Sequence, residues 1–597
     1  MIFSRKIFLQ FKASRELSNF YWSGFLRYNY LKSSYEIFLF EQFSEMAIKT
    51  DKKFIRDDND FRFQFYRSLS PKFKTAFFLN SLSFADEKLS GLSKASSNEI
   101  LLGLKFHPVS KLAFSILGGY KFDYQMGQRD NGWVYRISSD TTELNISDYH
   151  LRANLNHGED FITPRKNISS ALNLTLWRRF APEVESKIGF TAKRIKRDFY
   201  FYADTNLQKM YGVNFNIEGR DEKSLSVIFI LGYPLIENLM IDLNFAVDTR
   251  NIMKLIRYKT SSLYDSNIEE FNLNTGVAFA YESEKVRFKL GFNYAERNEI
   301  HTPKRNEFIT ESVFLRITQN EERKNNQSLR RSINGEFSVA MSERFFVGSM
   351  FYISLFRYDT PSILNDDDRD ELLQILRIFF RFKLSDEIFV DLPVDLNNQH
   401  LVYIFSTRSV NNNWNRIIKL SPSIAFERGR IRNYANFSVL ANYTVYDFEA
   451  QVSSVKSYVF RQFYLNDSLF FPVFDRISFE GNLQLIFSES GRLKWKEFKE
   501  RPTLFINTSE YNFRFVYSVS DDVKFSTGYR MFDERRFKFV GLDKVPDSRI
   551  TARGLTCGVE IGNEKFKFNL NGWIERLKFG ERISDVPNLN LSLIFNL

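Results

Sequence analysis

The feature that most constrains this chain is a strict alternation of apolar and polar residues in runs of about 9–12 residues. In one run the apolar face carries Leu239, Ile241, Leu243, Phe245 and Val247. Successive side chains of a β-strand point to opposite faces, so each run predicts a strand with one apolar and one polar face. Ordinary strands have about 5–6 residues, whereas a tilted strand that crosses a bilayer needs about 9–11. The length of the runs therefore favours membrane-spanning strands.

Short polar turns join the runs in pairs, and longer polar loops separate the pairs. The short turns are expected near Pro71, Pro108, Pro182, Pro234, Glu284, Glu343, Asp386, Gly429, Asp475, Asp521 and Asn563. Pro71 and Pro108 are 37 positions apart and Pro108 and Pro182 are 74 apart, so a further turn is expected between the last two. The longer loops are expected at residues 85–99, 297–327 and 358–371.

The pairing of runs predicts an all-β fold, namely one large antiparallel transmembrane β-barrel that spans residues 1–597. Counting hairpins gives about 24–28 strands and allows about 22. The first strand is expected near residues 2–11 and the last at residues 589–597. A β-propeller, whose blades have about 40–45 residues, is the main alternative, but a blade packs four short strands where this chain has two long ones.

Composition excludes several other classes. Aromatic residues make up 17% of the chain and hydrophobic residues 43%, which a disordered chain does not have. One cysteine, Cys557, excludes a disulfide scaffold and is interpreted as a small apolar side chain in a strand. Five histidines leave little material for a metal site, so we expect no metal and no cofactor. No run of about 18 apolar residues is present, which argues against a transmembrane helix.

The pattern resembles bacterial outer-membrane β-barrels, in which strands of about 10 residues alternate between short turns and longer loops. The C-terminal run, with Leu593, Phe595 and Leu597 on its apolar face, looks like the strand that the barrel-assembly machinery recognises in that class. Leu597 replaces the typical terminal aromatic residue. The resemblance implies short periplasmic turns, longer extracellular loops, an outer-membrane location, and outer-membrane lipids and the assembly machinery as partners.

The size is similar to porin-like large barrels, to the barrel portion of TonB-dependent receptors and to the large lipopolysaccharide-export barrel. No segment matches a receptor plug or a TonB box, so a plug or a periplasmic partner is left open. Residues 1–14 lack the apolar core and cleavage site of a secretory signal. We therefore expect either a cytosolic chain or the mature or truncated form of an exported one.

The basic excess, 83 Lys and Arg against 72 Asp and Glu, is spread over the polar faces rather than gathered in one patch. This argues against nucleic acid as a partner. The cations expected to face the lumen are Arg287, Lys289, Arg377, Arg381, Lys383, Arg514, Lys565 and Lys567. An open lumen lined by them would prefer anions. The alternative is that lumenal carboxylates such as Asp242 and Asp248 neutralise them.

Three polar segments are candidates for chemical sites. Residues 365–371 are rich in carboxylates, but their spacing is not that of an EF-hand, so a solvated loop is expected. Residues 156–160 combine His157 with two carboxylates, but the sequence fixes no nucleophile beside them, so a polar loop and no enzyme are expected. Trp414, among the amides of residues 411–416, is the preferred loop contact for a ligand; an interface tryptophan is the alternative.

The function expected from the sequence is passage of a solute or macromolecule across the outer membrane. The alternative is a structural or binding barrel that is closed by its own loops and anchors a partner.

Overall fold

The computed structural model describes residues 4–32, 34–49, 53–88, 91–181, 184–451, 457–541 and 543–596. All strands in these ranges belong to one antiparallel sheet. The strands are β1 (Ser4–Glu16), β2 (Asn19–Lys32), β3 (Tyr35–Lys49), β4 (Lys53–Ser68), β5 (Phe73–Lys88), β6 (Gly91–Val109), β7 (Leu112–Gln125), β8 (Gln128–Thr141), β9 (Leu144–Ile146), β10 (Tyr149–Thr163), β11 (Arg165–Ala181), β12 (Val184–Tyr202), β13 (Phe215–Ile236), β14 (Leu239–Ile256), β15 (Asp265–Glu282), β16 (Val286–Lys304), β17 (Asn326–Ser342), β18 (Phe345–Asp359), β19 (Arg369–Lys383), β20 (Ile388–Tyr403), β21 (Asn413–Leu420), β22 (Ser423–Arg428), β23 (Ile431–Tyr446), β24 (Tyr458–Phe474), β25 (Ile477–Lys494), β26 (Lys499–Ser520), β27 (Val523–Val540), β28 (Asp543–Gly562), β29 (Phe566–Phe579) and β30 (Arg582–Asn596).

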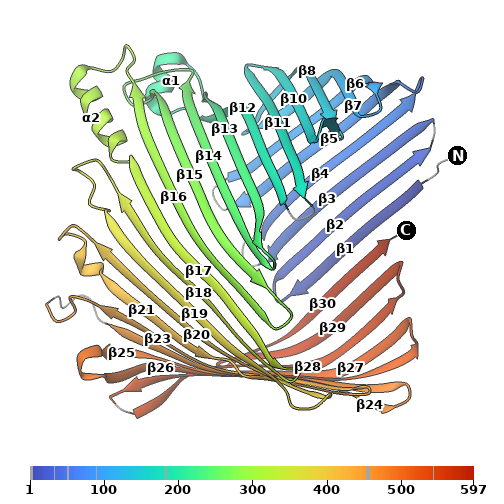
Figure 1. The fold of residues 1–597 in the computed structure, drawn as a ribbon, viewed down its shortest axis with the longest axis vertical. Helices are drawn as coiled ribbons and strands as arrows, with labels where there is room; N and C mark the ends of the chain where they lie inside the picture. Colours follow the sequence, from blue (N-terminus) through green and yellow to red (C-terminus); the bar gives the residue numbers. More distant parts are fainter. Residues whose placement is uncertain are drawn as a thin grey trace.

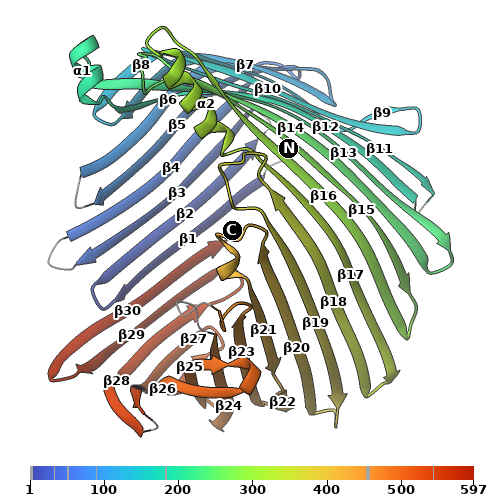
Figure 2. The same ribbon diagram turned by 90° about the vertical axis from the view of Figure 1, so that its left-hand side faces the viewer.

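The sheet closes on itself between the first and the last strand. β1 pairs with β30 from Phe8 opposite Asn596 to Arg15 opposite Leu589. Figures 1 and 2 both show the first strands, in blue, beside the last strands, in red. Closure satisfies the backbone groups that a sheet edge would leave unpaired, which is the condition for a β-structure to cross a membrane.

Thirty strands form a barrel of 28 staves in the described ranges, because two staves are interrupted. β9 continues β8, and both pair with β10. β22 continues β21, and both lie between β20 and β23. The second interruption falls at Ser421 and Pro422, where proline supplies no N–H for the ladder. The prediction of a single antiparallel barrel with about 24–28 strands is confirmed.

One end of the barrel, here called the short-turn end, carries the connections after β2, β4 and every second stave that follows. Both described chain ends lie there, since the number of staves is even. Ten of the eleven expected turn residues lie in or next to these connections; the exception, Pro182, lies outside the described residues. The additional turn expected between Pro108 and Pro182 is present at Ser147, between β9 and β10, with φ of 53°.

The opposite end, here called the loop end, has two very different sides. Between β12 and β24 the connections are long and include α1 (Thr205–Tyr211), α2 (Glu311–Glu322) and the 3₁₀ turn η1 (Ser409–Asn411). By contrast, two residues connect β1 to β2, β7 to β8 and β29 to β30. Figure 1 shows α1 and α2 on the left of the view and the two chain ends on the right.

Two of the expected loops are wrong. Residues 85–99 are mostly strand, because β5 runs to Lys88 and β6 begins at Gly91. Residues 156–160 lie within β10. Both segments are polar on the two faces, which is typical of loops but also of strands that extend above the apolar band of a barrel. The loops expected at 297–327 and 358–371 are shorter than predicted, since β16 runs to Lys304 and β19 begins at Arg369.

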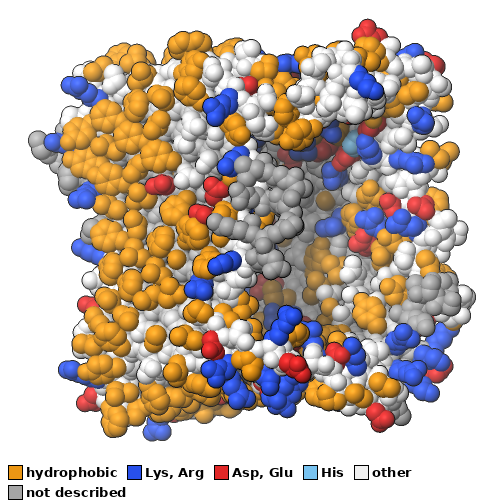
Figure 3. Space-filling model, turned by 180° about the vertical axis from the view of Figure 1, so that it is seen from behind, with side chains coloured by type: hydrophobic (Ala, Val, Ile, Leu, Met, Phe, Trp, Pro, Cys, Tyr) orange, Lys and Arg blue, Asp and Glu red, His pale blue; other side chains and the backbone are white. Residues whose placement is uncertain are grey.

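The apolar face of the sheet covers the outside. In Figure 3 apolar side chains cover the wall on the left of the view, and charged side chains gather around a hollow near the centre. The run from Leu239 to Val247 forms part of the outer face of β14, where Phe245 is 41% exposed. The structure therefore has the arrangement that a lipid environment requires, with apolar side chains outside and polar side chains inside.

Candidate functional site

The polar inner wall of the barrel is the candidate functional site. Directly opposed residues of neighbouring strands point to the same face. Such pairs connect Lys289 on β16 to Glu336 on β17, Glu336 to Met350 on β18, Met350 to Arg377 on β19, and Arg377 to Asp395 on β20. One row of the inner wall thus carries two neighbouring pairs of a cation and a carboxylate, with the neutral Met350 between the pairs.

Five of the eight cations named from the sequence have a carboxylate partner, which decides how much free charge they contribute. Arg377 Nε lies 3.1 Å from Asp395 Oδ1, and Arg381 Nε lies 2.7 Å from Asp391 Oδ1. The other three pairs are Arg287 with Glu282, Lys383 with Asp386, and Arg514 with Glu480. Pairing leaves little net field from these five groups.

The remaining three cations occupy different positions. Lys289 is exposed and stands opposite Glu336. Lys567 is exposed on β29, opposite Ile594. Lys565 lies in the turn before β29, where its N–H donates to Asn563 Oδ1 at 2.9 Å, so it belongs to the short-turn end rather than to the barrel wall.

A second group of inner-wall charges, which the sequence did not single out, lies towards the loop end of β6–β12. Asp160 on β10 accepts from Lys121 Nζ at 2.7 Å and from Arg136 Nη2 at 2.6 Å. Arg136 Nη2 also lies 2.8 Å from Glu99 on β6. The Asp160 side chain is only 9% exposed, so both of its oxygens need these partners.

Arg165 extends this network along the wall. Its side chain is 4% exposed and forms ion pairs with Asp123 and Asp130. Its guanidinium lies 4.9 Å from the ring centre of Tyr200, whose hydroxyl donates to Asp130 Oδ1 at 3.1 Å. Arg165 and Asp123 line a cavity of about 440 Å³ together with Lys121, Arg136 and Asp160. Five basic and three acidic side chains line the cavity, so it suits contact with a charged or polar solute.

Alternating polarity shows that such charges lie on one face of each strand, but not which strands meet. Arg165 and Asp123 are 42 positions apart. Only the register between β7, β8, β10 and β11 brings them together, and a single sequence carries no sign of that register.

Trp414 lies in a strand, not in a loop as expected, because β21 begins at Asn413. Its ring stacks on His400 with centroids 3.9 Å apart and planes at 9°. The Arg416 guanidinium lies between the rings of Trp414 and Trp495, at 4.8 and 4.9 Å from their centres. This packed aromatic cluster lies at the loop end of the outer face, which is the position of the interface tryptophan considered as the alternative.

The C-terminal strand forms the closure. Leu593 stands opposite Phe11, and Phe595 stands opposite Leu9, so both lie on the outer face of the seam. Leu597 lies outside the described residues. Recognition of this strand by the assembly machinery remains a prediction.

The long connections of the loop end bind one another and form what is here called the crown: residues 203–214, 257–264, 305–325, 360–368 and 404–412. Tyr211 donates to the carbonyl of Lys259, and Asn306 donates to the carbonyl of Leu263. Asn365 donates to the carbonyl of Arg323, and Thr407 donates to Asp366. The crown is thus continuous from β12 to β21.

Glu321 is the central anchor of the crown. Tyr264 donates to its Oε1 at 2.8 Å, and Lys324 Nζ lies 2.6 Å from the same oxygen. Burial alone would raise the pKa of Glu321, but Lys324 and Tyr264 hold that pKa below its usual value. Burial and the neighbouring carboxylate raise the pKa of Tyr264, which therefore stays a hydrogen-bond donor.

The acidic residues 365–371 are part of the crown and the start of β19. Asp367 Oδ1 lies 2.8 Å from Arg408 Nη2, and Asp368 Oδ1 accepts from the N–H of Thr360 at 2.7 Å. Within the described ranges no group of three or more acidic, histidine or cysteine side chains has the arrangement of a metal site.

No helix among the described residues is both long and apolar enough to cross a membrane. No family model matches the chain, and no curated protein matches it.

Solved structures that match the chain include transporters and receptors. The FrpB iron transporter from Neisseria meningitidis has a TM-score of 0.37 at 8% identity, over 82% of each chain. The ferric citrate transporter FecA has a TM-score of 0.38 at 8% identity, over 100% of this chain and 79% of that one. The siderophore receptor PirA from Acinetobacter baumannii has a TM-score of 0.35 at 10% identity, over 93% and 85%.

The closure of the sheet, the apolar exterior and the polar inner wall lead to one class of protein. The chain is a large β-barrel of the bacterial outer-membrane type.

Proposed function

We propose that this protein mediates the passage of a solute or macromolecule across the outer membrane. The observation that carries the proposal is the size of the closed barrel together with its polar inner wall. Barrels of about 16–18 staves already leave an aqueous channel, and side chains alone cannot fill a wider one. The chemistry is selective permeation, in which no bond of the solute is broken.

The loop end faces the cell exterior and the short-turn end faces the periplasm, as in other barrels of this type. The apolar outer face contacts outer-membrane lipids. The barrel-assembly machinery inserts the chain, and a plug or a periplasmic partner gates the lumen if the resting barrel is closed.

The inner wall supports a weak preference for anions. Five of the eight cations expected there have carboxylate partners, so their fields largely cancel. Lys289 stands opposite Glu336, which offsets part of its charge, whereas Lys567 stands opposite the neutral Ile594. Conductance should therefore depend on the charge balance of individual pairs rather than on a strongly basic lumen.

The crown favours a second candidate function, a binding or structural barrel that its own loops close. Hydrogen bonds join the long connections from α1 to η1 into one layer. A layer of that kind presents a preformed surface to a partner outside the cell. In this alternative the lumen conducts nothing.

The test is conductance of the heat-modifiable folded protein in a planar bilayer under a salt gradient. Large, steady steps with a slight anion preference would support the pore. A folded but silent protein would contradict the open pore and favour a gated, plugged or structural barrel. Heat modifiability on a gel is the control for folding, since it is independent of conductance.

A further inference from the structure

A polar cluster on the outer face, at the loop-end part of β8, β10 and β11, takes no part in the inner wall. His157 Nδ1 lies 2.7 Å from the hydroxyl of Ser170, which stands directly opposite it on β11. His157 Nε2 lies 3.0 Å from the hydroxyl of Tyr135 on β8. Both distances fall in the range that links a nucleophile to its base and the base to an orienting group.

The histidine is held from its far side by a charged pair. Glu159 Oε1 lies 3.7 Å from His157 Nε2, and Lys166 Nζ lies 2.9 Å from Glu159 Oε2. With Nε2 protonated, His157 donates to Tyr135 and accepts the Ser170 proton at Nδ1. The cluster therefore has the roles of nucleophile, base and orienter in one row across three strands.

The surroundings of Ser170 point to an acyl chain as the substrate group. Ser170 lines an outer cavity of about 790 Å³, in which Leu155, Leu172, Leu225 and Phe271 stand beside charged side chains such as Lys223 and Glu269. Leu155 on β10 and Leu172 on β11 stand directly opposite each other. A long apolar chain that lies along this wall would place its polar end at the serine.

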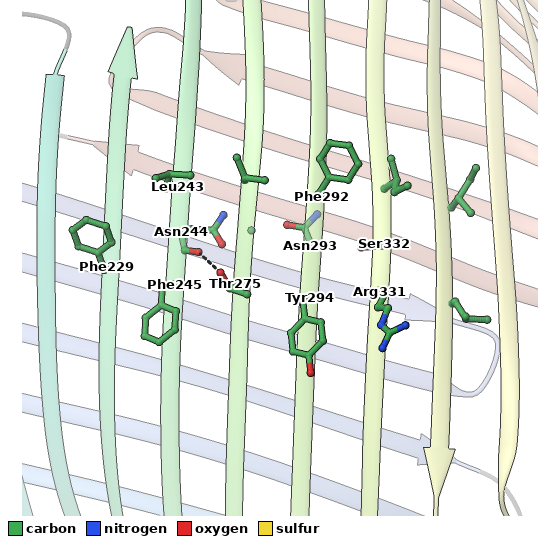
Figure 4. A pocket seen from close by; sticks show the side chains of 15 residues that line it. Phe229, Leu243, Asn244, Phe245, Thr275, Phe292, Asn293, Tyr294, Arg331 and Ser332 are labelled. Carbon is green, nitrogen blue, oxygen red and sulfur yellow. Dashed lines mark hydrogen bonds between the residues drawn. The ribbon is translucent and has the colours of Figure 1, made fainter. Parts of the chain in front are cut away.

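A second outer cavity, of about 780 Å³, continues the apolar surface across β13 to β18. Figure 4 shows Phe229 of β13, Leu243 and Phe245 of β14 and Phe292 of β16 around it. Leu225 and Phe229 lie on the same face of β13, so the two cavities share one wall. The exterior next to Ser170 is thus grooved rather than flat.

A charged pair lies beside Ser170 on the outer face. Arg194 is directly opposite Ser170 on β12. Its Nε and Nη2 lie 3.1 and 2.9 Å from the two carboxylate oxygens of Asp221, so the planar guanidinium is held in one orientation.

We propose that Ser170 and His157 form an esterolytic site for long-chain acyl esters of membrane lipids. The Ser170 oxygen bonds to the ester carbon while its proton moves to His157 Nδ1. The ester C–O bond then breaks, and the alcohol leaves with that proton. Water, deprotonated by His157, releases the fatty acid and restores the serine. Tyr135 and Glu159 are positioning residues, since they act through His157.

This site is independent of the proposed pore, because it lies on the outer face and the pore lies inside. The first experiment treats the full-length folded protein with an alkyl fluorophosphonate and maps the labelled peptide. We expect labelling of Ser170. A folded protein with no label on Ser170 would overturn the proposal, whatever its conductance.

The second experiment measures hydrolysis of a fluorogenic phosphatidylcholine in mixed micelles. Ser170→Ala and His157→Gln should each lower the rate by at least about 100-fold, the contribution of a general base. Ser169→Ala, on the same strand but on the inner face, should keep the full rate. Equal rates in Ser170→Ala and the parent protein would assign the activity to a contaminant and refute the site.

Tyr135→Phe separates positioning from folding. The variant should still be labelled at Ser170, but the pH midpoint of hydrolysis should shift, because His157 loses its hydroxyl partner. An unchanged pH profile would remove Tyr135 from the proposed site. Heat modifiability checks the fold of every variant, and two variants on different strands keep the test valid if one fails to fold.

Discussion

The two sides of the loop end differ in what holds them. From β12 to β21 the crown adds helices, hydrogen bonds and ion pairs above the sheet, with Glu321 at its centre. Near the seam, β1, β2, β29 and β30 end in two-residue turns, which the ladder and a few side-chain bonds stabilise, such as that from the N–H of Leu17 to Asn588 Oδ1 at 3.0 Å. The comparison shows that the sheet closes where its connections are short, and that the crown is a layer with its own stabilising contacts.

The largest expected effect is at the seam. Leu591 lies on the outer face of β30, opposite Ala13 and Leu570. Leu591→Arg should destabilise the barrel by about 2–4 kcal/mol, the cost of a cation near the bilayer midplane. Urea unfolding of the protein in lipid vesicles measures this.

Asn590→Arg is the matched control for this change, because it places the same charge one residue away on the inner face. Equal destabilisation by both variants would contradict the assignment of the two faces.

A smaller and local effect is expected in the crown. Glu321→Gln removes the charge that Lys324 and His301 face and weakens the bond from Tyr264. Docking of α2 should lose about 1–3 kcal/mol, the cost of a buried polar group left without its partner. Limited proteolysis of the loop between β16 and β17 reports this loss, while the heat modifiability of the barrel should stay unchanged. Loss of the folded barrel would show that the crown and the sheet are one unit.

The same anchor gives the crown a pH dependence. The pKa of Glu321 is lower in the folded protein than in the unfolded chain, so its contribution is complete above the unfolded value, about 4.3. The contribution is lost as the pH falls below that value and through the lowered folded pKa. Protease sensitivity of the crown should therefore rise only in acid. A rise between pH 6 and 8 would contradict the assignment to Glu321.

The smallest effect is expected from an exposed inner pair. The Arg381 and Asp391 side chains are 58% and 40% exposed, so water and salt screen their attraction. Asp391→Asn should shift the reversal potential slightly towards anions, and Arg381→Gln should shift it slightly towards cations. The double variant should return to the parent value. Shifts of the same sign in both single variants would exclude a lumenal pair.

The sequence predicts the barrel because the alternation extends across entire strands, such as Leu239 to Val247, and reports one face of each. The prediction from sequence fails where both faces of a strand are polar. Residues 85–99 and 156–160 have the composition of loops, yet neighbouring strands pair with them above the apolar band. Composition does not distinguish a loop in water from a strand in water.

The candidate sites show the same limit. The alternation identifies Arg377 and Arg381 as polar-face residues, but their partners Asp395 and Asp391 depend on the hairpin register. Ser170 and His157 meet only through the pairing of β10 and β11, and Arg165 meets Asp123 across three strands. The asparagines around Trp414 predict a loop, whereas in the structure β21 begins one residue before Trp414.

The seam between β1 and β30 has a consequence for the order of events during folding. Its partners, from Phe8 with Asn596 to Arg15 with Leu589, belong to the first and the last described strands, so the seam cannot form before β30 reaches β1. Contacts of such sequence separation are slow to form, because the chain must lose the entropy of the whole intervening loop first. Until then the growing sheet has two open edges, each able to pair with a foreign strand. The time that β30 takes to pair with β1 therefore sets how long these open edges are exposed to other strands.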